Sequence, residues 1–280
     1  MQPEITAFHH PATGRVTYLI ADPATLLCAF VDPVLDYDPR TQAVDTRFID
    51  AIIADVRAKD LGPTWILETG LHTDHLSAAG HLKYETGASI CIGAPVLDSL
   101  RRLVPVLGDD GVDLEGWDFD KLAQDGEALP MGGIEITAIA LPGRLPGATA
   151  YQIGDVVFTG SAILPPDQGL DDSAAPGADP AGQHAAARQL LGLPPETRLL
   201  VGQTGEVIDA WSTTVAEQKA RNVDAGDAVP AEAFLARRAA VAAAPGPLAA
   251  PALQVGIRAF RLPPEGEDGK RFPPVDVSSI

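Results

Sequence analysis

Alternating runs of apolar and polar residues divide the first half of the chain into short strands and helices. The runs VTYLIAD and TLLCAFVDP predict two strands that a short Asp-Pro turn joins into a hairpin. The spacing of apolar residues after them predicts three helices and two further strands. The helices are expected over 45–61, 76–86 and 96–104, and the strands over 65–68 and 88–93. This alternation of strands and helices favours a layered α/β fold.

The second half repeats strands followed by helices. Residues 105–133 are rich in Gly and Asp and predict a loop, and the apolar runs after them predict strands. The expected strands are Ile134–Ile139, TAYQI, VVFTG and Leu199–Val201. Three helices are expected, the first capped by Asp179, the second begun by a capping box of Thr214 and Glu217, and the third an Ala-rich run over 231–243. We interpret residues 1–280 as one domain, in which 245–280 form a Pro-rich linker and an extended tail packed on the rest.

Charge and composition narrow the classes of function. The chain has 280 residues, with 20 Lys and Arg against 38 Asp and Glu, which gives a net charge of −18. A nucleic-acid partner or an anionic membrane surface would require a basic face, so neither is expected. No apolar run reaches the length of a membrane span and no secretory signal is visible, so we expect a soluble cytoplasmic protein. Cys28 and Cys91 lie in apolar runs and are expected to be buried thiols.

One segment, Glu68–His75, carries a concentration of metal-binding residue types. His72, Asp74 and His75 follow a predicted buried strand and precede a predicted helix. Imidazole nitrogens and carboxylate oxygens at such a turn can converge on one point, and they are ligands for zinc, iron or manganese. The alternative is that Asp74 only caps the following helix and that the two histidines flank it.

The chain resembles the metallo-β-lactamase fold, in the branch of persulfide (sulfur) dioxygenases and glyoxalase II relatives. The resemblance is carried by ILETGLHTDHLSAAGHL and by stretches at both ends of the chain. These include TYLIADPAT and FVDPVLDYDP near the start, LLGLPPETRLL and TTVAEQKARN later, and LQVGIRAFRLPPEGEDGKRF near the end. It implies an αββα sandwich, in which two mixed sheets are flanked by helices and the metal site lies at the sheet edges.

The same resemblance shows that most expected metal ligands are replaced. The family pattern Thr-His-x-His-x-Asp-His becomes Thr-Gly-Leu-His-Thr-Asp-His here, so Gly70 stands where the first histidine belongs. At three later ligand positions the chain has Arg144 for histidine, Ser161 for aspartate and Gln203 for histidine. The resemblance implies that the single iron of the dioxygenases is held at the positions of Gly70, Arg144 and Ser161, and none of these three side chains can replace its ligand.

We therefore hypothesise that no metal cofactor is bound and that the Arg144 guanidinium pairs with Asp74 in its place. Under this hypothesis His72 and His75 are members of a hydrogen-bonded polar cluster. Two alternatives stay open. One is a single Fe or Zn ion at His72, Asp74 and His75, and the other is a metal-free hydrolytic pair of Ser161 with His72 or His75.

These substitutions predict a catalytically impaired or non-catalytic homologue that keeps a pocket for a small thiol or a glutathione-like ligand. The competing prediction is an active metal-dependent sulfur dioxygenase or thioester hydrolase that uses an altered site at His72, Asp74 and His75. A third is a structural or partner-binding role of the loop 164–179. Because related proteins often form dimers, the resemblance also implies a homodimer.

Overall fold

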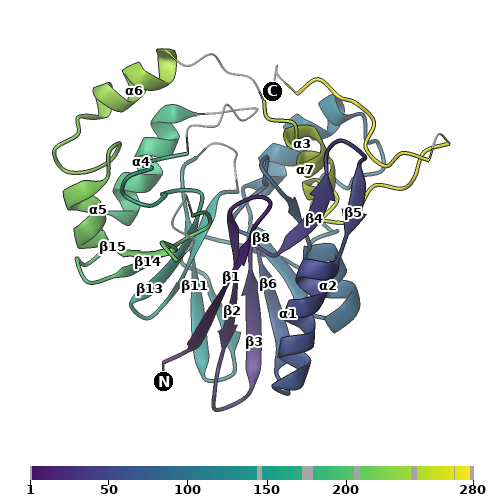
Figure 1. Ribbon diagram of the computed structural model, residues 1–280, viewed down its shortest axis with the longest axis horizontal. Helices are drawn as coiled ribbons and strands as arrows, with labels where there is room; N and C mark the ends of the chain where they lie inside the picture. Colours follow the sequence, from purple (N-terminus) through teal and green to yellow (C-terminus); the bar gives the residue numbers. More distant parts are fainter. Residues whose placement is uncertain are drawn as a thin grey trace.

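The protein is an αββα sandwich in a computed structural model (Figure 1), as the resemblance implied. The structure describes residues 2–143, 147–171, 179–204, 209–240, 245–267 and 269–277. Two six-stranded sheets lie side by side in the middle of the molecule, and helices cover their outer faces.

The first sheet has the order β1-β2-β3-β6-β8-β9. Its strands are β1 (Glu4–His10), β2 (Arg15–Ala21), β3 (Leu27–Val31), β6 (Gly62–Leu67), β8 (Ser89–Gly93) and β9 (Lys121–Ala123). The predicted hairpin is confirmed, since β2 and β3 pair antiparallel. From β3 to β9 the pairs are parallel, because the connections after β3, β6 and β8 contain helices that return the chain to the same end of the sheet.

The second sheet has the order β10-β11-β12-β13-β14-β15. Its strands are β10 (Ala128–Met131), β11 (Ile134–Ala140), β12 (Thr149–Ile153), β13 (Val156–Gly160), β14 (Arg198–Val201) and β15 (Ser212–Thr214). Only β13 and β14 of these neighbours pair parallel, and the chain between them contains a helix. The strands predicted at TAYQI and VVFTG are β12 and β13, with their turn at Gly154-Asp155.

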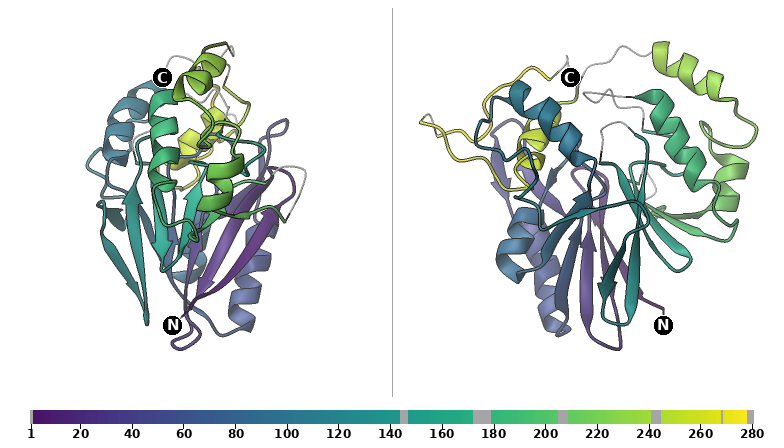
Figure 2. Two further views of the ribbon diagram at one scale, coloured as in Figure 1. Left: turned by 90° about the vertical axis from the view of Figure 1, so that its left-hand side faces the viewer. Right: turned by 180° about the vertical axis from the view of Figure 1, so that it is seen from behind.

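Helices cover the outer faces of both sheets, on opposite sides of the molecule (Figure 2). On the first sheet lie α1 (Arg47–Ala58), α2 (Ala79–Thr86), α3 (Val96–Leu107) and α7 (Ala249–Gly256); on the second lie α4 (Pro180–Leu190), α5 (Val215–Arg221) and α6 (Ala231–Ala240). The predicted caps are confirmed: Asp179 accepts a hydrogen bond from the Gly182 amide (3.0 Å), and Thr214 accepts one from the Glu217 amide (3.1 Å). A small third sheet, β5 (Ala43–Asp45), β4 (Val34–Asp38) and β7 (Leu76–Ser77), lies near α7.

Three clusters of buried apolar side chains fill the spaces between the four layers. Between the sheets, Tyr18 of β2 and Phe158 of β13 are fully buried and pack edge to face, with ring centroids 5.2 Å apart. A second cluster joins the first sheet to α1, α2, α3 and α7, and a third joins the second sheet to α4 and α6. The end-to-end burial of β2 reflects its place in the middle of this sandwich.

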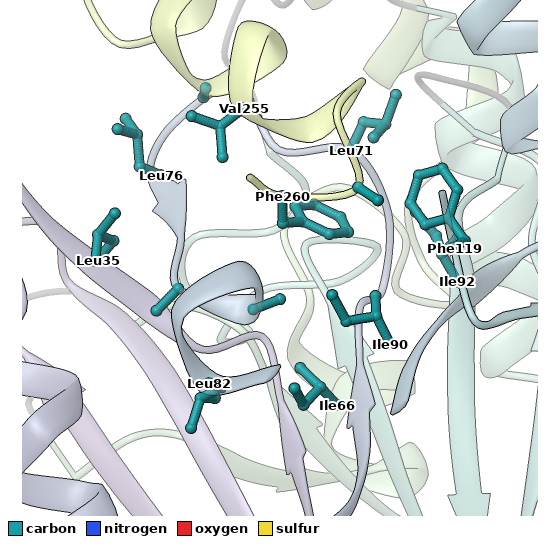
Figure 3. Close-up of a cluster of buried hydrophobic side chains, with 14 of the residues drawn as sticks. Leu35, Ile66, Leu71, Leu76, Leu82, Ile90, Ile92, Phe119, Val255 and Phe260 are labelled. Carbon is teal, nitrogen blue, oxygen red and sulfur yellow. The ribbon is translucent and has the colours of Figure 1, made fainter. Parts of the chain in front are cut away.

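The C-terminal segment is more ordered than the predicted linker and tail. It contains α7, and the Phe260 ring after α7 lies in the core beside Leu71 (Figure 3). This helix was not predicted, because its buried face is made largely of small residues, which give a weak hydrophobic pattern in the sequence. Residues 105–133 also differ from the predicted loop, since they contain the end of α3 and the strands β9 and β10.

Candidate functional site

One edge of the sandwich collects the residues that the sequence singled out. Strand β6 ends at Leu67, β13 at Gly160 and β14 at Val201, and the loop 68–75 follows β6. Because β2 runs antiparallel to β3, and β3 parallel to β6, the start of β2 reaches the same edge. Arg15, the first residue of β2, therefore lies among these strand ends.

Backbone pairing fixes Arg15 against the segment after β14. Arg15 forms an isolated antiparallel bridge with Gln203. The Val16 amide donates to the Gly202 carbonyl oxygen (3.1 Å), and the Thr204 amide donates to the Gly14 carbonyl oxygen (3.0 Å). The two sheets are thus joined at the point where Arg15 enters the site.

The buried Arg15 guanidinium connects two further strand ends. Its Nη1 donates to Ser161 Oγ (2.7 Å), directly after β13, and its Nη2 donates to Asp74 Oδ2 in the loop after β6. The Arg15 side chain is only 7% exposed. This charged contact is shielded from water, so it is worth more than a surface ion pair.

Asp74 is also hydrogen-bonded to the imidazole of the neighbouring His75. Its Oδ1 accepts a hydrogen bond from His75 Nδ1 (2.8 Å), because an ionised carboxylate can only accept. Burial, together with the cations His72 and Arg15 nearby, holds the pKa of His75 well below its usual range. His75 is therefore neutral with its proton on Nδ1, and Nε2 carries a lone pair. Nε2 is buried and has no hydrogen-bond partner among the described residues.

His72 lies between two buried carboxylates. Its Nε2 is 2.7 Å from Glu68 Oε2 and 3.5 Å from Asp32 Oδ1. Burial opposes protonation, but hydrogen bonds to Asp32 and Glu68 outweigh it and raise the pKa of His72 to about 9. Burial raises the pKa of Glu68 in turn, to about 7, although His72 opposes this rise. The imidazole is thus a cation that donates from Nε2 to Glu68 and forms an ion pair with Asp32.

A second set of hydrogen bonds holds these carboxylates in position. Asp32 accepts from the Thr69 amide (2.8 Å) and from Thr69 Oγ1 (2.7 Å), while Glu68 accepts from Ser77 Oγ. Tyr151, from the second sheet, donates to the Glu68 carbonyl oxygen (3.0 Å). The loop 68–77 is therefore fixed at both ends before any ligand binds.

A cavity of about 70 Å³ opens beside this cluster. Its wall includes His72 and Ser161 and, from α4, Gln183 and Ala186. The remaining described lining is mostly apolar or hydroxyl-bearing: Thr69, Gly70, Leu71, Leu141, Pro142, Gly143, Ala148, Thr149, Thr159, Ala162 and Asp171. An apolar cavity with a few polar groups is a common form of small-molecule site.

The structure brings together most of the residues predicted for the site. Ligand atoms of His72, Asp74 and His75 lie within 4.8 Å of one another. Gly70 and Ser161 line the adjoining cavity, and Gln203 pairs with Arg15 through the backbone. Arg144 lies outside the described residues, and the guanidinium that the structure shows on Asp74 is that of Arg15.

Two of the alternatives from the sequence are corrected by the site. Asp74 does not cap a helix, because β7 follows the loop and α2 begins only at Ala79, without a side-chain cap. Ser161 is bonded to Arg15 rather than to an imidazole, so the structure gives no hydrolytic pair with His72 or His75.

Arg15 and Asp32 were missed by sequence reasoning, and Glu68, the first residue of the segment Glu68–His75, was given no role. One feature of the sequence could have pointed to Arg15. It is an arginine at the start of a mostly apolar strand, RVTYLIA. Such a charge is costly to bury unless an acid meets it. Asp32 and Glu68 each follow a buried strand, where a carboxylate is placed at the sheet edge.

The residues present do not fit a metal ion of the expected kind. Gly70 supplies no donor, and Ser161 supplies a neutral hydroxyl that already accepts from Arg15. Both oxygens of Asp74 are engaged, one by Arg15 and one by His75. A permanent guanidinium cation in contact with Asp74 also repels a divalent cation there.

The fold and the site match one large group of proteins. Residues 15–202 match the family model of the metallo-beta-lactamase superfamily. This chain belongs to the metallo-beta-lactamase superfamily. The match begins at Arg15 and ends at Gly202, so it spans the strand ends that form the site.

Several superfamily members are similar over much of the chain. A beta-lactamase hydrolase-like protein of Agrobacterium fabrum is 34% identical over 281 residues, which cover 98% of this chain and 65% of that protein. The chain thus spans slightly less than two thirds of that relative's length. Glyoxylase B2 of Dictyostelium discoideum is 32% identical over 268 residues, 92% of this chain and 90% of that protein.

Other members support the persulfide dioxygenase and glyoxalase II-like branch. The human mitochondrial persulfide dioxygenase ETHE1 is 27% identical over 158 residues, which cover 55% of this chain and 50% of that protein. The crystal structure of ETHE1 from Myxococcus xanthus shares the fold with a TM-score of 0.74 and 22% identity, covering 92% of this chain and all of that one. Among the described residues, no helix is both long and apolar enough to cross a membrane.

Proposed function

We propose that this superfamily member is non-catalytic and binds a small molecule in the cavity beside Arg15, without a metal ion. The observation that carries the proposal is the contact of the buried Arg15 guanidinium with both Asp74 and Ser161. A cation fixed on these residues leaves them unable to bind iron as the dioxygenase pattern requires. Gly70 and Gln203 at two other ligand positions support the same conclusion.

As the ligand we propose a small acidic thiol, such as glutathione, with part of the molecule in this cavity. Among the lining residues, Ser161 is hydrogen-bonded to Arg15 and His72 is protonated, so we place the anionic group of the ligand beside them and away from the lining carboxylate Asp171. The rest of the described lining is mostly apolar and includes the Gln183 amide of α4. The names of two relatives, the human persulfide dioxygenase ETHE1 and a hydroxyacylglutathione hydrolase of Acidiphilium cryptum that is 30% identical over 215 residues, also point to a persulfide or glutathione ligand.

A second candidate function is an active metal-dependent sulfur dioxygenase or thioester hydrolase with an altered site. One observation favours it: ligand atoms of His72, Asp74 and His75 converge, and the buried His75 Nε2 has no partner in the described part of the chain. Such an enzyme would have to displace Arg15 from Asp74 before it bound metal.

Activity and metal content of protein purified without a histidine tag distinguish these functions. We expect well under one Fe or Zn per chain, no oxygen uptake with glutathione persulfide and no thioester hydrolysis after incubation with Fe²⁺ or Zn²⁺. Stoichiometric metal together with turnover would establish the second function and contradict the first.

Calorimetric titration with glutathione tests the ligand, with a matched pair of variants on α4. Ala186 lines the cavity and is 2% exposed, whereas Ala185 lies on the exposed face of the same helix. We expect Ala186→Leu to weaken glutathione binding at least tenfold and Ala185→Leu to leave it unchanged. No binding by the wild-type protein, or equal binding by both variants, would refute this ligand site.

A further inference from the structure

Arg15 lies where three elements that provide metal ligands in related proteins meet. We propose that its guanidinium is a permanent internal cation that takes the place of the metal ion and holds these elements together. The proposal rests on the metal-free site of the proposed function and concerns how that site is stabilised, so it stands whether or not glutathione binds in the cavity.

The contacts of Arg15 reach three of the positions at which the family resemblance places ligands. The guanidinium binds Asp74, in the loop after β6, and Ser161, at the end of β13. The Arg15 backbone pairs with Gln203, after β14. A metal ion in this fold links the same loop and strand ends through its ligands, and here one side chain makes the connection.

The charges of the cluster require a cation at this position. Asp32, Glu68 and Asp74 bring three carboxyl groups into one mostly buried region. Arg15 is the member whose positive charge is retained at any pH at which proteins fold. Without it, Asp74 would keep only the hydrogen bond from His75, and a partly buried carboxylate with so little compensation is strongly destabilising.

Removing Arg15 would leave a set of donors that a transition metal can use. Asp74 Oδ2 would be released, and ligand atoms of His72, Asp74 and His75 already lie within 4.8 Å of one another. His75 is 2% exposed, and its Nε2 lacks a partner in the described chain. His72 would release its Nδ1 proton to solvent when the metal binds, and two neutral imidazoles with a carboxylate suit Zn²⁺ or Co²⁺. Arginine and a divalent metal should therefore be interchangeable here.

Titration with Co²⁺, followed by its visible absorption, tests this exchange on three proteins. Arg15→Met removes the charge and keeps the length of the side chain, whereas Arg15→Lys keeps the charge. We expect the wild type and Arg15→Lys to show no bound-cobalt spectrum, and Arg15→Met to bind one Co²⁺ at least about a hundredfold more tightly than the wild type. Zn²⁺ should raise the Tm of Arg15→Met and leave that of the wild type unchanged.

Arg198→Met, an exposed position at the start of β14, controls for the general loss of a positive charge and should bind no cobalt. If Arg15→Met is insoluble, refolding it in Zn²⁺ should restore soluble protein. Equal cobalt binding by the wild type and Arg15→Met, or an Arg15→Met protein that neither binds cobalt nor is rescued by Zn²⁺, would overturn the proposal. A failed glutathione titration would change none of these results.

Discussion

Asp32 determines the shape of the loop that carries the candidate site. Its carboxylate accepts from the Thr69 amide (2.8 Å) and hydroxyl (2.7 Å) and lies 3.5 Å from His72 Nε2. The two Thr69 groups are buried and depend on Asp32 for a partner that water cannot replace, whereas His72 is shared between Asp32 and Glu68. Asp32, which is not among the expected metal ligands, therefore positions Thr69 and His72, the two ends of the segment Thr69–His72.

Replacing Asp32 with Asn tests this role without changing the backbone. Asp32 has a positive φ of 47°, a conformation that Asn also tolerates. Because the amide cannot accept from all the donors that the carboxylate serves, we expect Asp32→Asn to lower the free energy of unfolding by about 2–4 kcal/mol. Urea denaturation measures this loss.

The matched control is Asp55→Asn. Asp55 is a partly exposed carboxylate on α1 that pairs with Lys59 (2.7 Å), so this change should cost no more than about 0.5 kcal/mol. Equal losses for the two variants would mean that Asp32 has no special structural role.

The residues of the site were only partly predictable from the sequence. The short spacing of His72, Asp74 and His75 made their proximity predictable, and the need for a guanidinium to compensate Asp74 followed from electrostatics. The choice of Arg144 came from its place in the ligand pattern, whereas Arg15 reaches Asp74 through pairing with Gln203, 188 residues later in the chain. Such a pairing has no local signal in the sequence.

At the scale of elements, the segment from α7 to Phe260 covers the loop that carries His72 (Figure 3). The Phe260 ring centroid lies 6.4 Å from that of His72 and 6.1 Å from that of Phe119. A Cβ at Gly80 would collide with the Phe260 carbonyl oxygen, and one at Gly256 would come within 3.0 Å of the Leu71 side chain. The C-terminal segment is therefore part of the structure that supports the site.

We expect Phe260→Ala to lower the free energy of unfolding by about 3–5 kcal/mol, because it leaves a large cavity in a close-packed core. Leu262→Ala, two residues later and 36% exposed, should cost much less and serves as the control. Denaturant unfolding of both variants gives the difference. A Phe260→Ala protein as stable as Leu262→Ala would show that the segment does not hold the loop.

Elements with strong local signals were predicted well, and those that depend on distant partners were not. The caps at Asp179 and Thr214 and the β2–β3 hairpin rest on neighbouring residues. Helix α7 and strand β1 were missed, because a helix of small residues has little periodic signal and β1 is only partly buried. Residues 172–178, in the predicted loop 164–179, lie outside the described residues.

At the scale of the whole molecule, Arg15 is one of the residues that join the two sheets at the site. The chain has a net charge of −18, yet Arg15 is buried between the sheets' edges instead of serving solubility at the surface. The αββα sandwich of the superfamily is retained, with a TM-score of 0.74 to the ETHE1 structure. The fold of the superfamily is thus kept, while an arginine is proposed to stand in for the ligand-held metal.

A crystal structure of the untagged wild-type protein, grown with Zn²⁺ and Fe²⁺ and measured at both metal absorption edges, tests this claim most directly. The account predicts no anomalous peak at the site and density for the Arg15 guanidinium between Asp74 and Ser161. An anomalous peak bound by His72, Asp74 and His75, with Arg15 turned away, would contradict it.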